Sequence, residues 1–115
     1  MSDARSVVLE RRSRDARSVV LERDRDGIHK FVARFPEGRT VHFGRRGYSD
    51  YTIHKDPARM RRYLTRHRTR ENWTRSGATT AGFWSRWLLW SRPSFRQALK
   101  QTEKVLGRRI IFRAK

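Results

Sequence analysis

The chain has 115 residues, of which 29 are Lys or Arg and 11 are Asp or Glu, and its formal net charge is +18. This length fits one domain, and a hydrophobic content of 36% predicts a small core that depends on aromatic side chains. Because there is no Cys, disulfide frameworks, Cys-ligated metal sites and thiol nucleophiles are excluded. No apolar run reaches the roughly 20 residues of a membrane span, and no signal-peptide hydrophobic region is present, so we expect an intracellular protein.

The positive charge belongs to the body of the chain. Residues 1–27 contain seven Arg and six acidic residues, whereas residues 28–115 contain 22 Lys or Arg and five acidic residues. Arg supplies 24 of the 29 cations. Its guanidinium makes planar, bidentate contacts with phosphate and carboxylate, so this distribution predicts a localised docking surface for an anionic partner.

A nine-residue segment occurs twice near the N-terminus. Asp3–Arg11 recurs without change as Asp15–Arg23, at an offset of 12 residues. Two copies are too few for a solenoid, so we interpret residues 1–14 as a duplicated arm and residues 15–115 as a single small basic domain. The arm either hangs free or adds as a spare strand to the edge of a sheet, through the apolar residues Val7, Val8 and Leu9.

Alternating apolar and polar residues predict a short antiparallel β-meander. The second repeat copy forms its first strand, and residues 31–35 and 39–43 form a hairpin around the turn at residues 36–38. The alternation places these residues on one face: Phe31, Ala33, Phe35, Val41 and Phe43. It places these on the outward face: Lys30, Arg34, Thr40 and His42. The Gly44-x-x-Gly47 pattern that follows is typical of a plain turn, with a phosphate-clamping loop as the alternative.

Capping signals predict about three helices after the sheet. Asp56 and Pro57 begin a helix that runs to about Arg70, and Thr80 begins a Trp-rich helix that is apolar almost all round and therefore buried. A capping box at Ser94 begins the last helix. Residues 108–113 then form a short C-terminal strand that returns to the sheet edge, so the expected fold class is α+β.

The first of these helices carries the densest positive charge. Between residues 57 and 75 there are seven Arg and one Glu, and such a face repels itself unless an anion covers it. We predict contacts with a partner or with phosphate for Arg45, Arg46, Arg59, Arg62, Arg66, Arg70 and Arg75. Three aromatic residues interleaved with these cations are either base-stacking groups or anchors in the core or a loop: Tyr48, Tyr51 and Trp73.

The sequence does not favour catalysis. The five acidic residues of the body are too few for a convincing pair of metal-binding carboxylates, and no serine or threonine has a partner that would mark a nucleophile. The four His residues lack a metal-ligand spacing, so a zinc or catalytic role would require distant residues to meet in the fold. We therefore expect no enzyme activity, no catalytic or metal site, no cofactor and no small-molecule substrate.

Several long blocks resemble a small uncharacterised family encoded by nucleocytoplasmic large DNA viruses. The blocks are Phe-Gly-x-x-Gly-Tyr-Ser-Asp-Tyr-Thr-Ile-His-Lys-Asp at 43–56, Arg-Tyr-Leu-x-Arg-His at 62–67, Arg-Glu-Asn-Trp at 70–73 and Thr-Ala-Gly-Phe-Trp-Ser-Arg-Trp-Leu-Leu-Trp at 80–90. The resemblance covers about residues 28–107, and the duplicated arm lies outside it. It implies a viral setting and no particular mechanism.

Two functions follow as hypotheses. The first is a structural component of the virion, a minor capsid or cement-type protein that contacts capsid or other virion proteins and is present in the host cytoplasm during assembly. The alternative is a protein that binds the DNA or RNA backbone without sequence specificity, because no sequence-reading motif is present.

Overall fold

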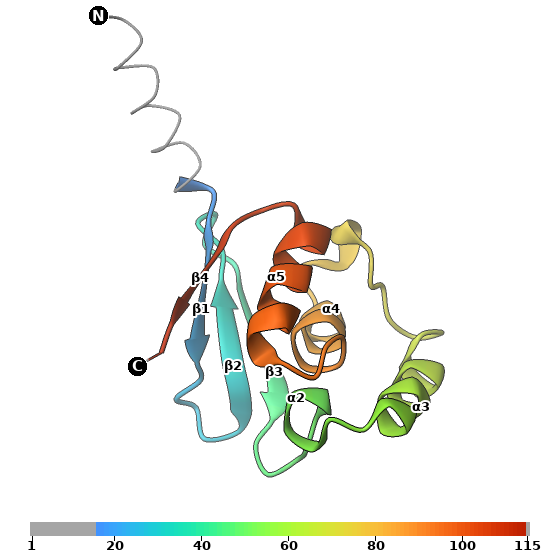
Figure 1. The fold of residues 1–115 in the computed structure, drawn as a ribbon. Helices are drawn as coiled ribbons and strands as arrows, with labels where there is room; N and C mark the ends of the chain where they lie inside the picture. The colour runs from blue at the N-terminus through green and yellow to red at the C-terminus, as the bar shows by residue number, and fades with distance from the viewer. Residues whose placement is uncertain (1–15, 115) are drawn as a thin grey trace, which may run out of the picture.

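The computed structural model describes residues 16–114, which form a four-stranded sheet with helices on one side (Figure 1). The strands are β1 (Val19–Arg23), β2 (His29–Arg34), β3 (Thr40–Arg45) and β4 (Ile110–Arg113). The helices are α2 (Tyr51–His54), α3 (Pro57–His67), α4 (Ala81–Trp84) and α5 (Phe95–Leu106), with a 3₁₀ turn η1 (Arg75–Gly77) and a π-helical turn η2 (Ser85–Leu89). The predicted α+β class is confirmed.

The sheet has the strand order β3-β2-β1-β4. Its first three strands form the predicted antiparallel meander, in which Phe31 lies opposite Phe43 and Ala33 opposite Val41. The C-terminal strand is also confirmed, but β4 pairs with β1 in the parallel direction. The sheet is therefore mixed and is more than a simple meander.

The core lies between the sheet and the helices that cover one of its faces, α4 and α5 (Figure 1). Side chains with no exposed surface come from both layers: Val19, Leu21, Ala33, Phe83, Trp84, Leu88 and Ala98. The ring of Trp84 contacts Phe43 and Phe35 of the sheet side, at centroid distances of 5.6 and 6.1 Å. The Trp-rich segment is thus the centre of the core, as its all-round apolar character predicts.

Two helices differ from their predicted bounds. The Trp-rich helix ends as an α-helix at Trp84 and continues as η2, where the Trp90 N–H donates to the Ser85 carbonyl at 3.1 Å. The wider π turn rotates Leu89 into the core, where it is 3% exposed, whereas a regular α-helix would point it away. Helix α3 ends at His67. Arg70 therefore lies beyond the helix on which it was predicted.

A short helix that the sequence analysis missed, α2, connects the sheet to α3. Its N-cap is Asp50, whose carboxylate accepts a hydrogen bond from the Thr52 N–H at 2.9 Å. Asp50 is 2% exposed and forms an ion pair with Lys30 at 2.6 Å. The prediction that Lys30 faces outward is therefore wrong, because a buried carboxylate requires a charged or hydrogen-bonding partner.

Gly44 leaves the space that the Lys30 side chain occupies. A Cβ atom at Gly44 would lie 3.1 Å from the Lys30 Cβ and 3.0 Å from the Leu89 Cδ1, and the residue has a φ of 71°. Gly47 also has a positive φ, 86°, but a Cβ there would meet nothing within 4 Å. Gly47 is therefore required only for its left-handed backbone conformation, whereas Gly44 is required both for that conformation and for the absence of a side chain.

We expect Gly44→Ala to lower the free energy of unfolding by about 2–4 kcal/mol and Gly47→Ala by only about 1–2 kcal/mol, because both strain a left-handed backbone but only Gly44 is overpacked. Urea unfolding of the two variants beside the parent chain measures the difference. Equal losses would show that close packing at Gly44 contributes nothing.

The strand residues predicted in the duplicated arm, Val7, Val8 and Leu9, lie outside the described residues. Within the described part of the chain, no helix has both the length and the apolar composition for crossing a membrane.

Candidate functional site

A hollow of about 430 Å³ opens between the loop after β3 and the helices α3 and α4. We call it the basic cleft. Three of its lining residues, Arg45, Tyr48 and Arg66, were predicted to contact a partner or a nucleic acid. The lining also includes Tyr63, His67, Glu71 and Trp90. Segments that are about 20 residues apart in the sequence therefore share one concave surface.

Two guanidiniums and an exposed ring characterise the basic cleft. Arg45 and Arg66 both belong to its lining, from β3 and α3 respectively. The Tyr48 side chain is 65% exposed, and the Arg45 guanidinium carbon lies 5.6 Å from the centre of its ring. An exposed tyrosine beside arginine offers a stacking surface next to positive charge.

The acidic groups of the basic cleft are already paired inside the protein. Asp50 binds Lys30, and Glu71 accepts hydrogen bonds from the Trp73 indole N–H at 2.9 Å and pairs with the His67 ring at 3.0 Å. Within the described residues, neither Arg45 nor Arg66 forms an ion pair with a carboxylate. The charge that the cleft presents to a ligand is therefore positive.

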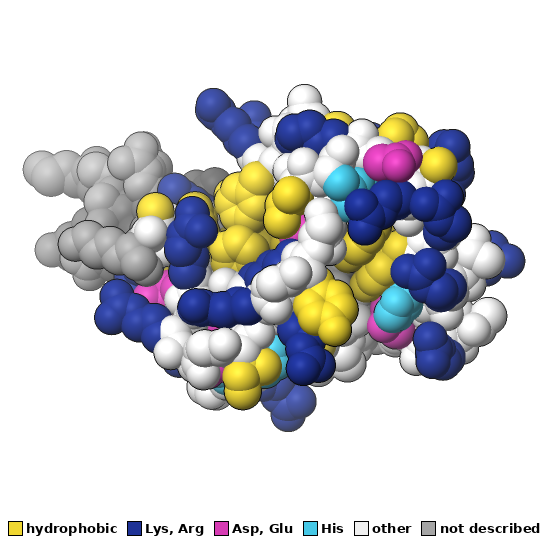
Figure 2. Space-filling view, turned by 90° about the horizontal axis from the view of Figure 1, so that it is seen from below, with side chains coloured by type: hydrophobic (Ala, Val, Ile, Leu, Met, Phe, Trp, Pro, Cys, Tyr) yellow, Lys and Arg dark blue, Asp and Glu magenta, His cyan; other side chains and the backbone are white. Residues whose placement is uncertain are grey.

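Helix α3 extends this positive surface beyond the basic cleft. At about 100° per residue, Arg59, Arg62 and Arg66 fall within an arc of roughly 60°. All three are exposed, and no described carboxylate pairs with them. Figure 2, which views the molecule from below, shows Lys and Arg side chains spread over this face with hydrophobic side chains between them. We call Arg59, Arg62 and Arg66 the arginine row.

Tyr63 attaches the arginine row to the core. Its ring is 7% exposed and stacks on Trp90 at a centroid distance of 4.2 Å with an interplanar angle of 2°. The His67 ring covers it at the same distance, 4.2 Å. Burial raises the pKa of Tyr63 well above its ordinary value, so the phenol is neutral at physiological pH. A rigid aromatic stack thus fixes the position of the helix that carries the charges.

His54 lies just before α3, near the start of the helix that carries the arginine row. Its Nδ1 accepts the Asp56 N–H at 2.9 Å, and its Nε2 is buried without a hydrogen-bond partner in the described chain. A ring that accepts at Nδ1 is neutral. Burial of the ring, together with the Arg59 guanidinium, lowers the pKa of His54.

Because its pKa is lower in the folded chain, His54 takes up protons more readily when the chain is unfolded. The stability that it contributes is full above the unfolded value of about 6.5 and is lost as the pH falls through the lower pKa of the folded state. We expect the His54 ring to titrate below 6.5 in an NMR pH titration, and His54→Gln to reduce the loss of stability between pH 7.5 and 5. A folded-state pKa at or above 6.5 would contradict this account.

Three of the predicted arginines lie outside the basic cleft and the arginine row. Arg46 donates from Nε to the His29 carbonyl at 3.0 Å and also binds the Asp24 carbonyl, so it braces the β1–β2 turn. Arg75 donates to the Val105 carbonyl at 3.2 Å, at the C-terminal end of α5, where a cation is favourable. Arg70 is exposed beyond α3 and donates to the carbonyl of Arg66 at 3.3 Å.

Tyr51 and Trp73, for which the sequence left a stacking role and an anchoring role open, are anchors inside the fold. Tyr51 is 7% exposed, because α2 turns its ring toward the interior, and it offers no free face to a base. Trp73 is half-buried, and the Arg86 guanidinium carbon lies 5.4 Å from the centre of its ring. Of these three aromatic residues, Tyr48 alone presents an exposed ring.

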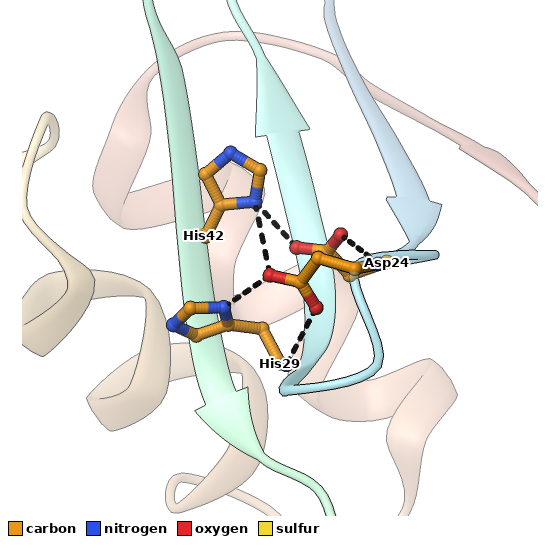
Figure 3. A group of neighbouring side chains, drawn as sticks. Asp24, His29 and His42 are labelled. Carbon is orange, nitrogen blue, oxygen red and sulfur yellow. Dashed lines mark hydrogen bonds and ion pairs between the residues drawn. The ribbon is translucent and has the colours of Figure 1, made fainter.

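A second group of polar residues, which the sequence analysis missed, lies on the other side of the sheet from the helices (Figure 3). Asp24 and Asp26 come from the β1–β2 turn, His29 begins β2 and His42 lies in β3. We call this group the Asp–His cluster. The His residues have no metal-ligand spacing along the sequence, but the pairing of β2 with β3 brings two of them to one place. Their ring centroids are 5.6 Å apart.

Comparison with known proteins places one segment of the chain in context. Residues 19–67 match the model of a family of unknown function, DUF5754. This segment runs from β1 to the end of α3 and includes the arginine row, the Asp–His cluster and the residues of the basic cleft that precede residue 68. No curated protein and no solved structure matches the chain.

Proposed function

We propose that this protein binds single-stranded nucleic acid without sequence specificity, through the basic cleft and the arginine row. One observation carries the proposal: the exposed Tyr48 ring lies in a cleft that Arg45 and Arg66 line, and neither guanidinium pairs with a described carboxylate. Phosphates would contact the guanidiniums, and an unpaired base would stack on the ring.

The rest of the surface supports a strand that continues past the cleft. Arg59 and Arg62 follow Arg66 along the same arc of α3, so the row offers successive contacts to a phosphate backbone. The stack of Tyr63 on Trp90 holds α3 in place, so this helix is already folded before a nucleic acid binds. Such contacts position a strand and do not read its bases.

Tyr48 provides the test that separates single-stranded from duplex binding. We expect Tyr48→Ala to weaken binding to a mixed-sequence single strand by about 5–150-fold, the equivalent of about 1–3 kcal/mol for one stacked base. Affinity for a duplex of the same sequence should change little, because duplex bases are not free to stack. Fluorescence anisotropy with labelled oligonucleotides at fixed salt measures both.

Ile53→Ala is the matched control. Ile53 is 61% exposed, as Tyr48 is 65% exposed, but it does not line the basic cleft. It should leave both affinities unchanged. Tyr48→Ala could instead weaken single-strand and duplex binding by the same factor, or leave both unchanged. Either result would show that Tyr48 does not stack on a base and that the proposed preference for single strands is wrong.

We also propose a second candidate, a structural role in the particle of a large DNA virus. The resemblance of about residues 28–107 to a family of such viruses supports it, and so does the arginine row, since guanidiniums bind the carboxylates of an acidic capsid protein as readily as phosphates. In this case the protein is a minor capsid or cement-type component, located in the virion and in the host cytoplasm during assembly.

Competition between polyanions distinguishes the two candidates. If polyglutamate displaces a bound oligonucleotide at the same concentration of negative charge, an acidic protein partner is favoured. If the oligonucleotide remains bound, nucleic acid is favoured. Absence of the protein from purified particles would exclude the structural role.

A further inference from the structure

We propose that Asp24, Asp26, His29 and His42 bind a zinc ion that ties the β1–β2 turn to β3. The four donor atoms, one from each side chain, all lie within 4.8 Å of one another. Both His residues direct Nδ1 toward the carboxylates, as Figure 3 shows for Asp24, His29 and His42. This site is independent of the proposed binding of nucleic acid.

The spacing of the donor atoms is close to that of a tetrahedral zinc site. With zinc–ligand bonds of about 2.0–2.2 Å, donor atoms in a tetrahedron lie about 3.3–3.6 Å apart. In the Asp–His cluster the His42 Nδ1 is 3.9 Å from Asp26 Oδ2 and 2.5 Å from Asp24 Oδ2, and the His29 Nδ1 is 2.6 Å from Asp26 Oδ2. The hydrogen-bonded pairs must open by about 0.7–1.1 Å, and donor pairs as far apart as 4.8 Å must close by up to about 1.5 Å, for these contacts to become ligation.

Hydrogen bonds to the other carboxylate oxygens hold the ligands in orientation. The Asp24 Oδ1 accepts the Asp26 N–H at 3.1 Å, and the Asp26 Oδ1 accepts the N–H groups of Ile28 and His29, both at 2.8 Å. The Oδ2 atoms therefore remain directed at the imidazoles. Metal sites in proteins use such outer contacts to fix their ligands.

Charge and ligand type favour zinc over other common cations. Two ionised carboxylates with two neutral imidazoles carry a charge of −2, which a divalent ion neutralises. Asp carboxyl groups have an ordinary pKa of about 3.9 and need no shift to be ionised at physiological pH. Imidazole nitrogens suit zinc and disfavour Mg²⁺ and Ca²⁺, which take oxygen ligands. Four protein ligands close the coordination shell, which is typical of a structural rather than a catalytic site.

The positive charge of Arg46, close to the Asp–His cluster, lowers the affinity of the cluster for zinc. Arg46 binds the backbone carbonyls of Asp24 and His29, so its positive charge lies close to the cluster. The same contacts hold the turn in the conformation that presents both Asp residues. If zinc does not bind, the cluster consists of two Asp–His ion pairs, and the experiment distinguishes these states directly.

The test uses the full chain, freed of metal with a chelator beforehand, and Zn²⁺ alone. Isothermal titration should give saturable binding of one Zn²⁺ per chain and a Tm that rises with zinc concentration. Co²⁺ in place of zinc should give the visible absorption of a tetrahedral site. Asp26→Asn, at an exposed position, keeps the oxygen that accepts the backbone N–H groups and should weaken zinc binding by at least about 10-fold, and His29→Asn with His42→Asn by more than about 100-fold.

His67→Asn is the control, because His67 also pairs with a carboxylate but lies on α3, outside the cluster. It should leave zinc binding unchanged. Far-UV circular dichroism of each variant confirms that it is folded. The inference is overturned if the parent chain shows no saturable zinc binding, or if the double His variant binds zinc as tightly as the parent does.

Discussion

Replacement of the arginine row by Gln, in the variant Arg59→Gln, Arg62→Gln and Arg66→Gln, is expected to weaken binding to single-stranded nucleic acid about 100-fold at 0.1 M salt. This magnitude follows if each guanidinium neutralises one phosphate, and if each neutralised phosphate raises the affinity at 0.1 M salt by about 0.7 of a decade relative to 1 M salt. The three side chains are exposed, so the variant should fold as the parent does. Fluorescence anisotropy with a labelled oligonucleotide measures the change.

A matched variant removes the same charge from another surface. Arg96→Gln, Lys100→Gln and Lys104→Gln lie on α5, and all three positions are exposed. The net charge falls by the same three units, so an effect of total charge alone would weaken binding equally. We expect less than about a fivefold loss for this control, since only long-range attraction is reduced. Equal losses in the two variants would contradict a localised interface.

Replacement of Trp84 by Ala is expected to have the largest effect on stability, a loss of about 3–5 kcal/mol in the free energy of unfolding. The side chain is completely buried, and its indole N–H donates to the Ala78 carbonyl at 2.8 Å. The substitution therefore leaves a cavity and a carbonyl without its partner. Small domains have a total stability of about 5–15 kcal/mol, so the variant would be close to unfolding at room temperature.

Two comparisons make the Trp84 result interpretable in urea unfolding followed by far-UV circular dichroism. Trp84→Phe keeps a large ring but loses the N–H donor, and should cost less than Trp84→Ala. Ile53→Ala, at an exposed position, should change the free energy of unfolding by less than about 0.5 kcal/mol. A loss below about 1 kcal/mol for Trp84→Ala would show that the core is centred elsewhere.

The parts of the fold that depend on local patterns could be predicted from the sequence. Alternation predicted the three-stranded meander, and the caps at Asp56, Thr80 and Ser94 each accept the expected backbone N–H. What could not be predicted depends on contacts between distant residues. The parallel pairing of β4 with β1 requires the whole helical layer between them, and α2 is too short, at four residues, to leave a periodic pattern.

The surface was predictable in composition but only partly in arrangement. The helical spacing placed Arg59, Arg62 and Arg66 on one face, and in the structure they are exposed and no described carboxylate pairs with them. Arg46 and Arg75 instead meet backbone carbonyls whose positions only the folded chain defines. For Tyr51 the sequence left a base-stacking role and an anchoring role open, and the four-residue helix α2 turns the ring inward as an anchor.

The Asp–His cluster depends on the register of the hairpin. The alternation placed Phe31 and Phe43 on one face of the hairpin, and the structure adds the register: Phe31 lies opposite Phe43 and His42 opposite Val32, within reach of the start of β2. Asp24 and Asp26 then follow from the turn between β1 and β2. The residue types were visible, but their convergence required the pairing of three strands.

A salt titration of oligonucleotide binding tests the central claim most directly. If Arg45, Arg59, Arg62 and Arg66 each neutralise one phosphate, the logarithm of the association constant should fall with the logarithm of salt concentration with a slope of about −3 for a single strand. The arginine-row variant should reduce the slope to about −1, and the α5 variant should leave it near −3. A slope near zero in the parent chain, or the same slope in all three proteins, would contradict the proposed interface.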